Sequence, residues 1–212
     1  MPYGYTDQAK RKGMMKYMNE FFWFFLAAAV LQNVVLITGF GSSILLRVSR
    51  KRLNILPFSI ILCIFTTLTT LVCFPLDELI GTGVVSKWLR PLMIISVTAV
   101  LYIVSVLILR SRFQALFNRI SRLLTIAAFN NLVIGIAGIV NHQFAVTLPG
   151  AVGLSLGACA GFLLLSWLTA EGMERLDNPD VPKAFRGLPS ILIYLGILSL
   201  ALMGFEGSVS LI

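Results

Sequence analysis

Long apolar segments alternate with short polar segments along the whole chain after residue 20. Six of these segments are close to or above the length needed to cross a bilayer, since about 20 apolar residues in a helix span its hydrocarbon core of roughly 30 Å. The pattern predicts an all-α integral membrane protein with six transmembrane helices. Their expected bounds are about 21–46, 54–74, 91–109, 123–140, 145–170 and 188–205.

The composition leaves no room for a separate soluble catalytic domain. Of the 212 residues, 58% are hydrophobic and 12% are charged, whereas soluble domains carry about 25% charged residues. We therefore divide the chain into a basic N-terminal extension at 1–20 and a six-helix membrane domain at 21–212. The net charge of +8 lies in clusters of Lys and Arg beside apolar segments, without the interleaved aromatic side chains of a nucleic-acid surface. The expected environment is the lipid bilayer, and no nucleic-acid partner is expected.

The distribution of positive charge predicts an orientation. With six spans, the first, third and fifth loops carry four, four and three Lys and Arg residues, eleven in all, against six on the other side. Because Lys and Arg concentrate in cytoplasmic loops, we expect these three loops in the cytoplasm and both termini outside. Four of the opposing six lie in the N-terminal extension, so that segment argues against this orientation.

A weak internal repeat relates the two halves of the chain. The segment Val30–Leu36 aligns with Ala128–Ile134 at an offset of 98 residues, and each copy has two adjacent side-chain amides followed by glycines. Three spans separate the copies, so the second copy crosses the membrane in the opposite direction. This predicts two inverted three-helix repeats, at about 21–110 and 121–212.

Amides and glycines inside an apolar helix are typical of a broken helix, because the amides satisfy backbone groups that no water can reach. We predict that the first and fourth spans are interrupted, near Gly39–Gly41 and near Asn130–Gly135, and meet near the midplane in a candidate site. The alternative is that the same amides only hydrogen-bond across helices and hold them together, and the sequence leaves both open. The candidate site comprises Asn33, Gly39, Gly41, Ser43, Asn130, Asn131 and Gly135.

Other motifs point to packing rather than chemistry. Gly153, Gly157 and Gly161 are spaced by four and are expected to form one close-packing face of the fifth span.

The chain lacks a Walker A loop, a G-x-G-x-x-G and an H-E-x-x-H, so we expect no catalytic residue. Cys63, Cys73 and Cys159 have no C-x-x-C spacing, and we interpret them as small buried packing groups. No metal ligand is expected.

Several short motifs resemble one membrane protein family. Asn33-Val34-Val35-Leu36 with Gly41 resembles its first-helix motif, and Asn130 with Val133 and Gly135 resembles its fourth-helix motif. Further similarity lies in the last 40 residues, in Glu174-Arg175-Leu176, Asp180-Val181-Pro182, Phe185-Arg186-Gly187 and Met203-Gly204-Phe205-Glu206-Gly207. The family is Rnf-Nqr, represented by the A subunit of the Rnf electron transport complex and the E or D subunit of the sodium-translocating NADH:quinone reductase.

The resemblance implies a multi-pass subunit of the prokaryotic cell (inner) membrane. In the family, such a subunit pairs with a homologous subunit of opposite topology, and the two share a [2Fe-2S] cluster that passes electrons across the bilayer. Electron transfer is coupled to sodium or proton transport, so the chain is expected to be a non-catalytic subunit of a translocase.

The sequence departs from the family at the cluster. Ser43 and Asn131 stand where the family has cysteines, and iron–sulfur clusters are held mainly by thiolates. We therefore expect that this chain alone binds no cluster and contributes no ligand. The alternative function is a stand-alone, cluster-free transporter or channel of the same fold.

Overall fold

The computed structural model describes residues 3–31, 33–80, 84–142, 147–176, 182 and 185–206, and helices are the only regular secondary structure within them. This confirms the predicted all-α class. The elements are α1 (Tyr3–Leu26), the π-helix η1 (Ala27–Leu31), α2 (Val34–Thr38), α3 (Ser42–Ser49), α4 (Arg52–Ile80), α5 (Val84–Arg112), α6 (Gln114–Ala128), α7 (Asn131–His142), α8 (Leu148–Leu176) and α9 (Leu188–Glu206).

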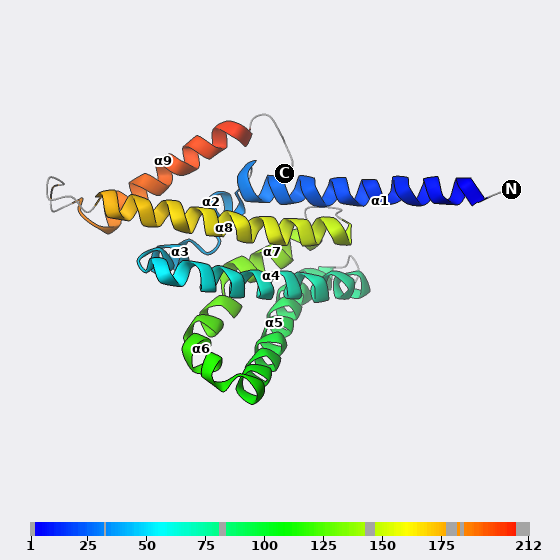
Figure 1. Ribbon diagram of the computed structural model, residues 1–212, viewed down its shortest axis with the longest axis horizontal. Helices are drawn as coiled ribbons and strands as arrows, with labels where there is room; N and C mark the ends of the chain where they lie inside the picture. The colour runs from blue at the N-terminus through cyan, green and yellow to red at the C-terminus, as the bar shows by residue number, and fades with distance from the viewer. Residues whose placement is uncertain are drawn as a thin grey trace.

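Helix α8 is the centre of the arrangement. It lies between α1 and α4, contacts α4 along its length and α1 with its N-terminal half, and runs antiparallel to α4 (Figure 1). Helices α5 and α6 form a hairpin on the far side of α4, and α7 packs against α4 and α5. Helix α9 packs against the C-terminal half of α8, on the side away from α4.

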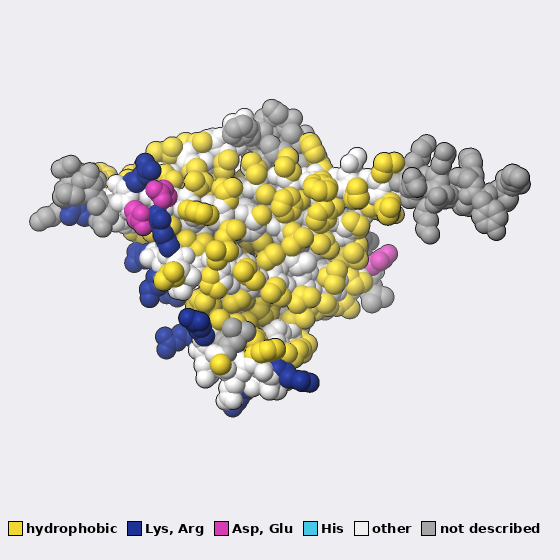
Figure 2. All heavy atoms as spheres, viewed as in Figure 1, with side chains coloured by type: hydrophobic (Ala, Val, Ile, Leu, Met, Phe, Trp, Pro, Cys, Tyr) yellow, Lys and Arg dark blue, Asp and Glu magenta, His cyan; other side chains and the backbone are white. Residues whose placement is uncertain are grey.

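The core consists of large apolar side chains from α4, α7 and α8. Phe58 of α4 and Phe162 of α8 are fully buried, with ring centroids 5.8 Å apart. Leu132 and Ile136 of α7 join the same cluster. The outer surface is apolar too, as the side chains over α4, α5 and α8 in Figure 2 show. A surface of this kind is suited to acyl chains rather than to water.

Four regions of the described residues satisfy the length and hydropathy expected of a span. Three are continuous, Arg52–Glu78, Trp88–Arg112 and Leu148–Leu176, and the fourth is Phe117–Ala128 with Asn131–Val140, bent by 44°. The apolar helix Leu188–Gly204 is shorter than these. The structure therefore supports a multi-pass membrane protein with three to four candidate spans, fewer than the six expected.

The helices differ from the expected segments in two places. Helix α1 starts at Tyr3 and runs through residue 20 without a break, so most of the expected extension at 1–20 and the start of the expected first span lie on one helix. After Leu26 the chain continues as η1, α2 and α3. The break between α2 and α3 falls at Gly39 and Gly41, whose positive φ angles no α-helix accommodates. The expected loop at 76–90 is mostly helical, because α4 continues to Ile80 and α5 begins at Val84. Of the expected loop at 171–187, residues 177–181, 183 and 184 lie outside the described residues.

Candidate functional site

The first interruption is organised by Asn33, which precedes α2. The Asn33 Oδ1 accepts a hydrogen bond from the Val35 N–H at 3.1 Å, and its Nδ2 donates to the Ala29 carbonyl at 3.1 Å. The side chain is only 2% exposed. One amide thus caps the start of α2 and satisfies a carbonyl of η1, which offsets the cost of freeing backbone groups in an apolar setting.

A second turn follows at the end of α2. Gly39 ends α2 with φ 71° and Gly41 precedes α3 with φ 78°. Both lie in the left-handed region, which glycine enters without steric cost. Between them Phe40 projects toward α7, and its ring lies directly over Gly135.

The second interruption separates α6 from α7. Asn130 is 1% exposed, and its Oδ1 accepts a hydrogen bond from the Leu132 N–H at 3.2 Å. This repeats the contact of Asn33 with Val35. Among the described residues, the Asn130 Nδ2 has no hydrogen-bond partner.

The two interruptions lie against each other. A β-carbon built on Gly41 would sit 3.6 Å from both the Nδ2 and the Oδ1 of Asn130. A β-carbon on Gly135 would lie well inside 3.0 Å of the Phe40 ring. The short segment from Phe40 to Gly41 therefore packs into the angle between α6 and α7.

The residues of the candidate site fall into two groups. Asn33, Gly41 and Asn130 are buried and Gly135 is half-buried, whereas Gly39, Ser43 and Asn131 are exposed. Asn33 and Asn130 have the same capping role, 97 residues apart, whereas the expected alignment at an offset of 98 pairs Asn33 with Asn131. The expected break over Asn130–Gly135 is shorter than stated, because α7 runs without interruption from Asn131 through Gly135.

The glycines of α8 form its contact with α1 and η1. A β-carbon on Gly153 or Gly157 would lie well inside 3.0 Å of the Phe21 or Phe25 carbonyl oxygen, respectively. On Gly161 it would sit 2.7 Å from the Asn33 Nδ2. Successive glycines on α8 thus allow the backbone of α1 to approach, and the last of them makes room for the cap of α2.

Two ionic contacts were missed in the sequence. Arg90 of α5 pairs with Asp77 of α4 at 2.5 Å, and their side chains are 10% and 12% exposed. The signal was present, since an acid shortly after one apolar segment and a base just before the next suggest a pair. Sequence spacing alone did not show that both helices extend far enough to bury it.

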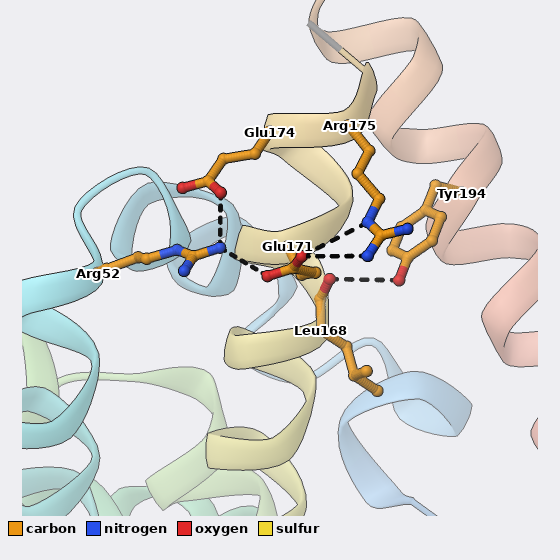
Figure 3. A network of polar contacts seen from close by, with 6 residues as sticks. All are labelled: Arg52, Leu168, Glu171, Glu174, Arg175 and Tyr194. Carbon is orange, nitrogen blue, oxygen red and sulfur yellow. Dashed lines mark hydrogen bonds and ion pairs between the residues drawn. The ribbon is translucent and has the colours of Figure 1, made fainter.

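The other contact is an exposed network at the end of α8 (Figure 3). Arg52, at the start of α4, binds Glu171 and Glu174, each at 2.7 Å, and Arg175 approaches Glu171 at 3.4 Å. Tyr194 of α9 donates to the Leu168 carbonyl at 3.2 Å. These contacts hold the beginning of α4 and the end of α8 on the same side of the protein.

Apolar helices, interrupted by capped breaks that meet inside the core, define a polytopic helical membrane protein of the kind seen in transport systems. Comparison with known proteins specifies the family. Residues 21–209 match the family model described as Rnf-Nqr subunit, membrane protein. The chain belongs to the Rnf-Nqr family.

Three relatives share one name, the A subunit of the ion-translocating oxidoreductase complex. The chain is 31% identical over 192 residues to this protein from Pasteurella multocida (strain Pm70), covering 91% of this chain and 100% of that protein. The relative from Glaesserella parasuis serovar 5 is 29% identical over 194 residues, with 92% and 100% covered. That from Yersinia enterocolitica serotype O:8 is 31% identical over 192 residues, with 91% and 99% covered.

Proposed function

We propose that this chain is a membrane subunit of a redox-driven, ion-translocating electron transport complex of the Rnf/Nqr type, and that it supplies no iron–sulfur ligand. The observation that carries the first part is the family match, which spans residues 21–209. The relatives with similarity over about nine-tenths of the chain are named as the A subunit of an ion-translocating oxidoreductase complex.

The absence of a ligand is argued from the donor atoms. Ser43 and Asn131 occupy the positions where the family resemblance places cysteines, and both side chains are exposed near the contact of Gly41 with Asn130. A hydroxyl or an amide oxygen is a weak donor to iron compared with a soft, charged thiolate. Cys63, Cys73 and Cys159 lie on α4 and α8, so they do not replace the missing thiolates by position in the chain. The residues present do not fit a [2Fe-2S] cluster held by this chain.

The proposed architecture has six crossings in two inverted repeats. Helix α9 contains 19 residues, about 28 Å at 1.5 Å per residue, which is close to the thickness of the hydrocarbon core. The segments α1, η1, α2 and α3 together supply the first crossing. The matching caps at Asn33 and Asn130 support the repeat.

The proposed orientation places loops 1, 3 and 5 in the cytoplasm and both termini outside. The contact of Arg52 with Glu171 and Glu174 supports the shared side of loops 1 and 5. A homologous subunit of opposite topology is the proposed partner. Ser43 and Asn131 are exposed polar groups in a largely apolar surface, and such groups gain from a partner that covers them.

The test begins with the chain expressed together with the genes beside its own. Affinity purification through a tag on this chain should recover other subunits of a redox complex, including a homologous membrane subunit. The isolated chain, purified without oxygen, should contain no stoichiometric iron or sulfide and give no EPR signal on reduction. A stoichiometric cluster lost on substituting Cys63, Cys73 or Cys159 would overturn the ligand proposal.

One further result would favour the alternative of a stand-alone transporter or channel. In that case the chain would purify without partners and move ions across liposome membranes with no electron donor present. The orientation is tested separately with a reporter fused after Ile212, for which we expect activity only from a reporter that works outside the cytoplasm.

A further inference from the structure

Two of the three cysteines meet between α4 and α8, although 95 residues separate them in the sequence. The thiols of Cys63 and Cys159 are within hydrogen-bonding reach of each other. Both also line the same groove. Cys73 is elsewhere, in a separate small cluster with Ile94 and Ala137.

The neighbouring contacts hold the two thiols in place. Toward one end of α4, the Phe58 and Phe162 rings pack with centroids 5.8 Å apart. Toward the other end, the Ser155 hydroxyl donates to the Thr70 hydroxyl at 3.0 Å. Because α4 and α8 are in contact on both sides of the cysteine pair, the two thiols remain close to each other. Bond formation between them therefore needs little rearrangement of the helices.

The groove gives the pair an apolar route to the outside. Its volume is about 280 Å³. The side chains around its mouth include Leu56 and Ile60, which are 62% and 55% exposed. Cys63 is half-buried, whereas Cys159 is buried. A lipid-soluble molecule in the bilayer can approach along such a surface, whereas a charged one meets a large cost of desolvation.

We propose that Cys63 and Cys159 form a reversible dithiol–disulfide pair that cross-links α4 to α8 and is oxidised from the bilayer by a quinone. Two S–H bonds break and one S–S bond forms. The two electrons and two protons pass to the quinone, which becomes the quinol. The reverse reaction restores both thiols. Thiols and disulfide are both neutral, so neither end state places a charge in the apolar groove.

The link has a consequence for the interrupted helices. Cys159 stands between Gly157 and Gly161, the glycines against which Phe25 and Asn33 pack. A covalent tie from α4 to this turn of α8 fixes the helix that supports the cap of α2. Oxidation is therefore expected to stiffen the region where the two interruptions meet.

The test uses the full chain in lipid nanodiscs and counts thiols by mass after alkylation in denaturant. The oxidant is a fully ring-substituted benzoquinone with a short alkyl chain, because such a ring has no free carbon for thiol addition. Before oxidation, all three cysteines should be alkylated. After oxidation, only Cys73 should be alkylated, and the chain weighed before alkylation should be lighter by about 2 Da for the two hydrogens lost. A dithiol reductant should restore all three.

Three variants make the assignment. After oxidation, Cys63→Ala and Cys159→Ala should each retain two alkylated cysteines, whereas Cys73→Ala should retain none. Ferricyanide, which is charged, should react at least about tenfold more slowly than the quinone because it does not enter the apolar groove. Three free thiols in the quinone-treated wild type, a disulfide that includes Cys73, or a link between two chains would overturn the proposal. Equal rates with both oxidants would overturn access from the bilayer. Each variant is first shown to elute as one monodisperse species.

Discussion

Gly41 and Asn130 are in contact where the two helix interruptions meet. A β-carbon on Gly41 would lie 3.6 Å from both polar atoms of the Asn130 side chain. Next to this contact, the Phe40 ring covers Gly135. Two breaks separated by about 90 residues in the sequence are thus packed as one unit, and its energetics can be tested by substitution.

The Phe40–Gly135 contact gives the first prediction. Gly135→Ala places a methyl group in the space that the Phe40 ring occupies. Overpacking of this kind lowers the stability by about 1–3 kcal/mol. Phe40→Leu should restore part of that loss, so the two substitutions should be strongly non-additive. Thermal unfolding is measured in detergent. It is detected by the reaction of the buried cysteines, once they become exposed, with a fluorescent maleimide.

Gly138 supplies the matched control on the same helix. Its β-carbon would come no closer than 3.9 Å to Ile94, so Gly138→Ala should be neutral or stabilising. If Gly135→Ala is tolerated as well as Gly138→Ala, the packing of Phe40 against α7 is wrong.

The glycine face of α8 gives the second prediction. Gly157→Ala drives a methyl group against the backbone carbonyl of Phe25, which has less freedom to move than a side chain. We expect a loss of stability of roughly 2–3 kcal/mol. Gly196→Ala on α9 is the control, since nothing lies within 4 Å of its β-carbon and alanine favours a helix by up to about 1 kcal/mol over glycine.

The class of the fold was predictable, and much of the site was not. Apolar segment length alone predicted an all-α membrane protein, and positive φ angles do occur at the predicted break, at Gly39 and Gly41. The repeat placed Asn131 opposite Asn33, yet Asn130 is the buried cap. A shift of one residue turns a helix by about 100°, so an alignment of apolar letters cannot decide which of two adjacent amides faces inward.

Contacts between helices that lie far apart in the sequence could not be predicted, for a different reason. The meeting of Cys63 with Cys159 depends on how α4 and α8 rotate against each other, and that is set by Phe58, Phe162 and the glycines together. The burial of Asp77 and Arg90 depends on helices longer than the apolar segments they contain. The six crossings and the orientation of the termini stay predictions.

The third prediction concerns the two caps. Asn33→Ala removes both the acceptor for the Val35 N–H and the donor to the Ala29 carbonyl. Asn130→Ala removes the acceptor for the Leu132 N–H, and its Nδ2 has no partner to lose among the described residues. Loss of a cap costs about 1 kcal/mol, and a second lost hydrogen bond adds about 1–2 kcal/mol. Asn33→Ala should therefore be the more damaging change in unfolding experiments, and the reverse order would contradict the assigned contacts.

The last prediction compares two ion pairs that differ in burial. The Asp77–Arg90 pair is 10–12% exposed, whereas the Arg52–Glu174 pair is 47% and 62% exposed. Removing one partner of a buried pair costs about 3–5 kcal/mol, because the other buried charge loses the opposite charge beside it. An exposed pair contributes about 0–1 kcal/mol. Asp77→Asn should thus destabilise the protein far more than Glu174→Gln.

Raising the salt from roughly 0.05 M to 0.5 M should reduce the effect of Glu174→Gln and leave that of Asp77→Asn nearly unchanged, since ions screen exposed charges most. Equal effects of the two substitutions, or equal salt dependence, would show that Asp77 and Arg90 are open to water and that α4 and α5 are not packed as described.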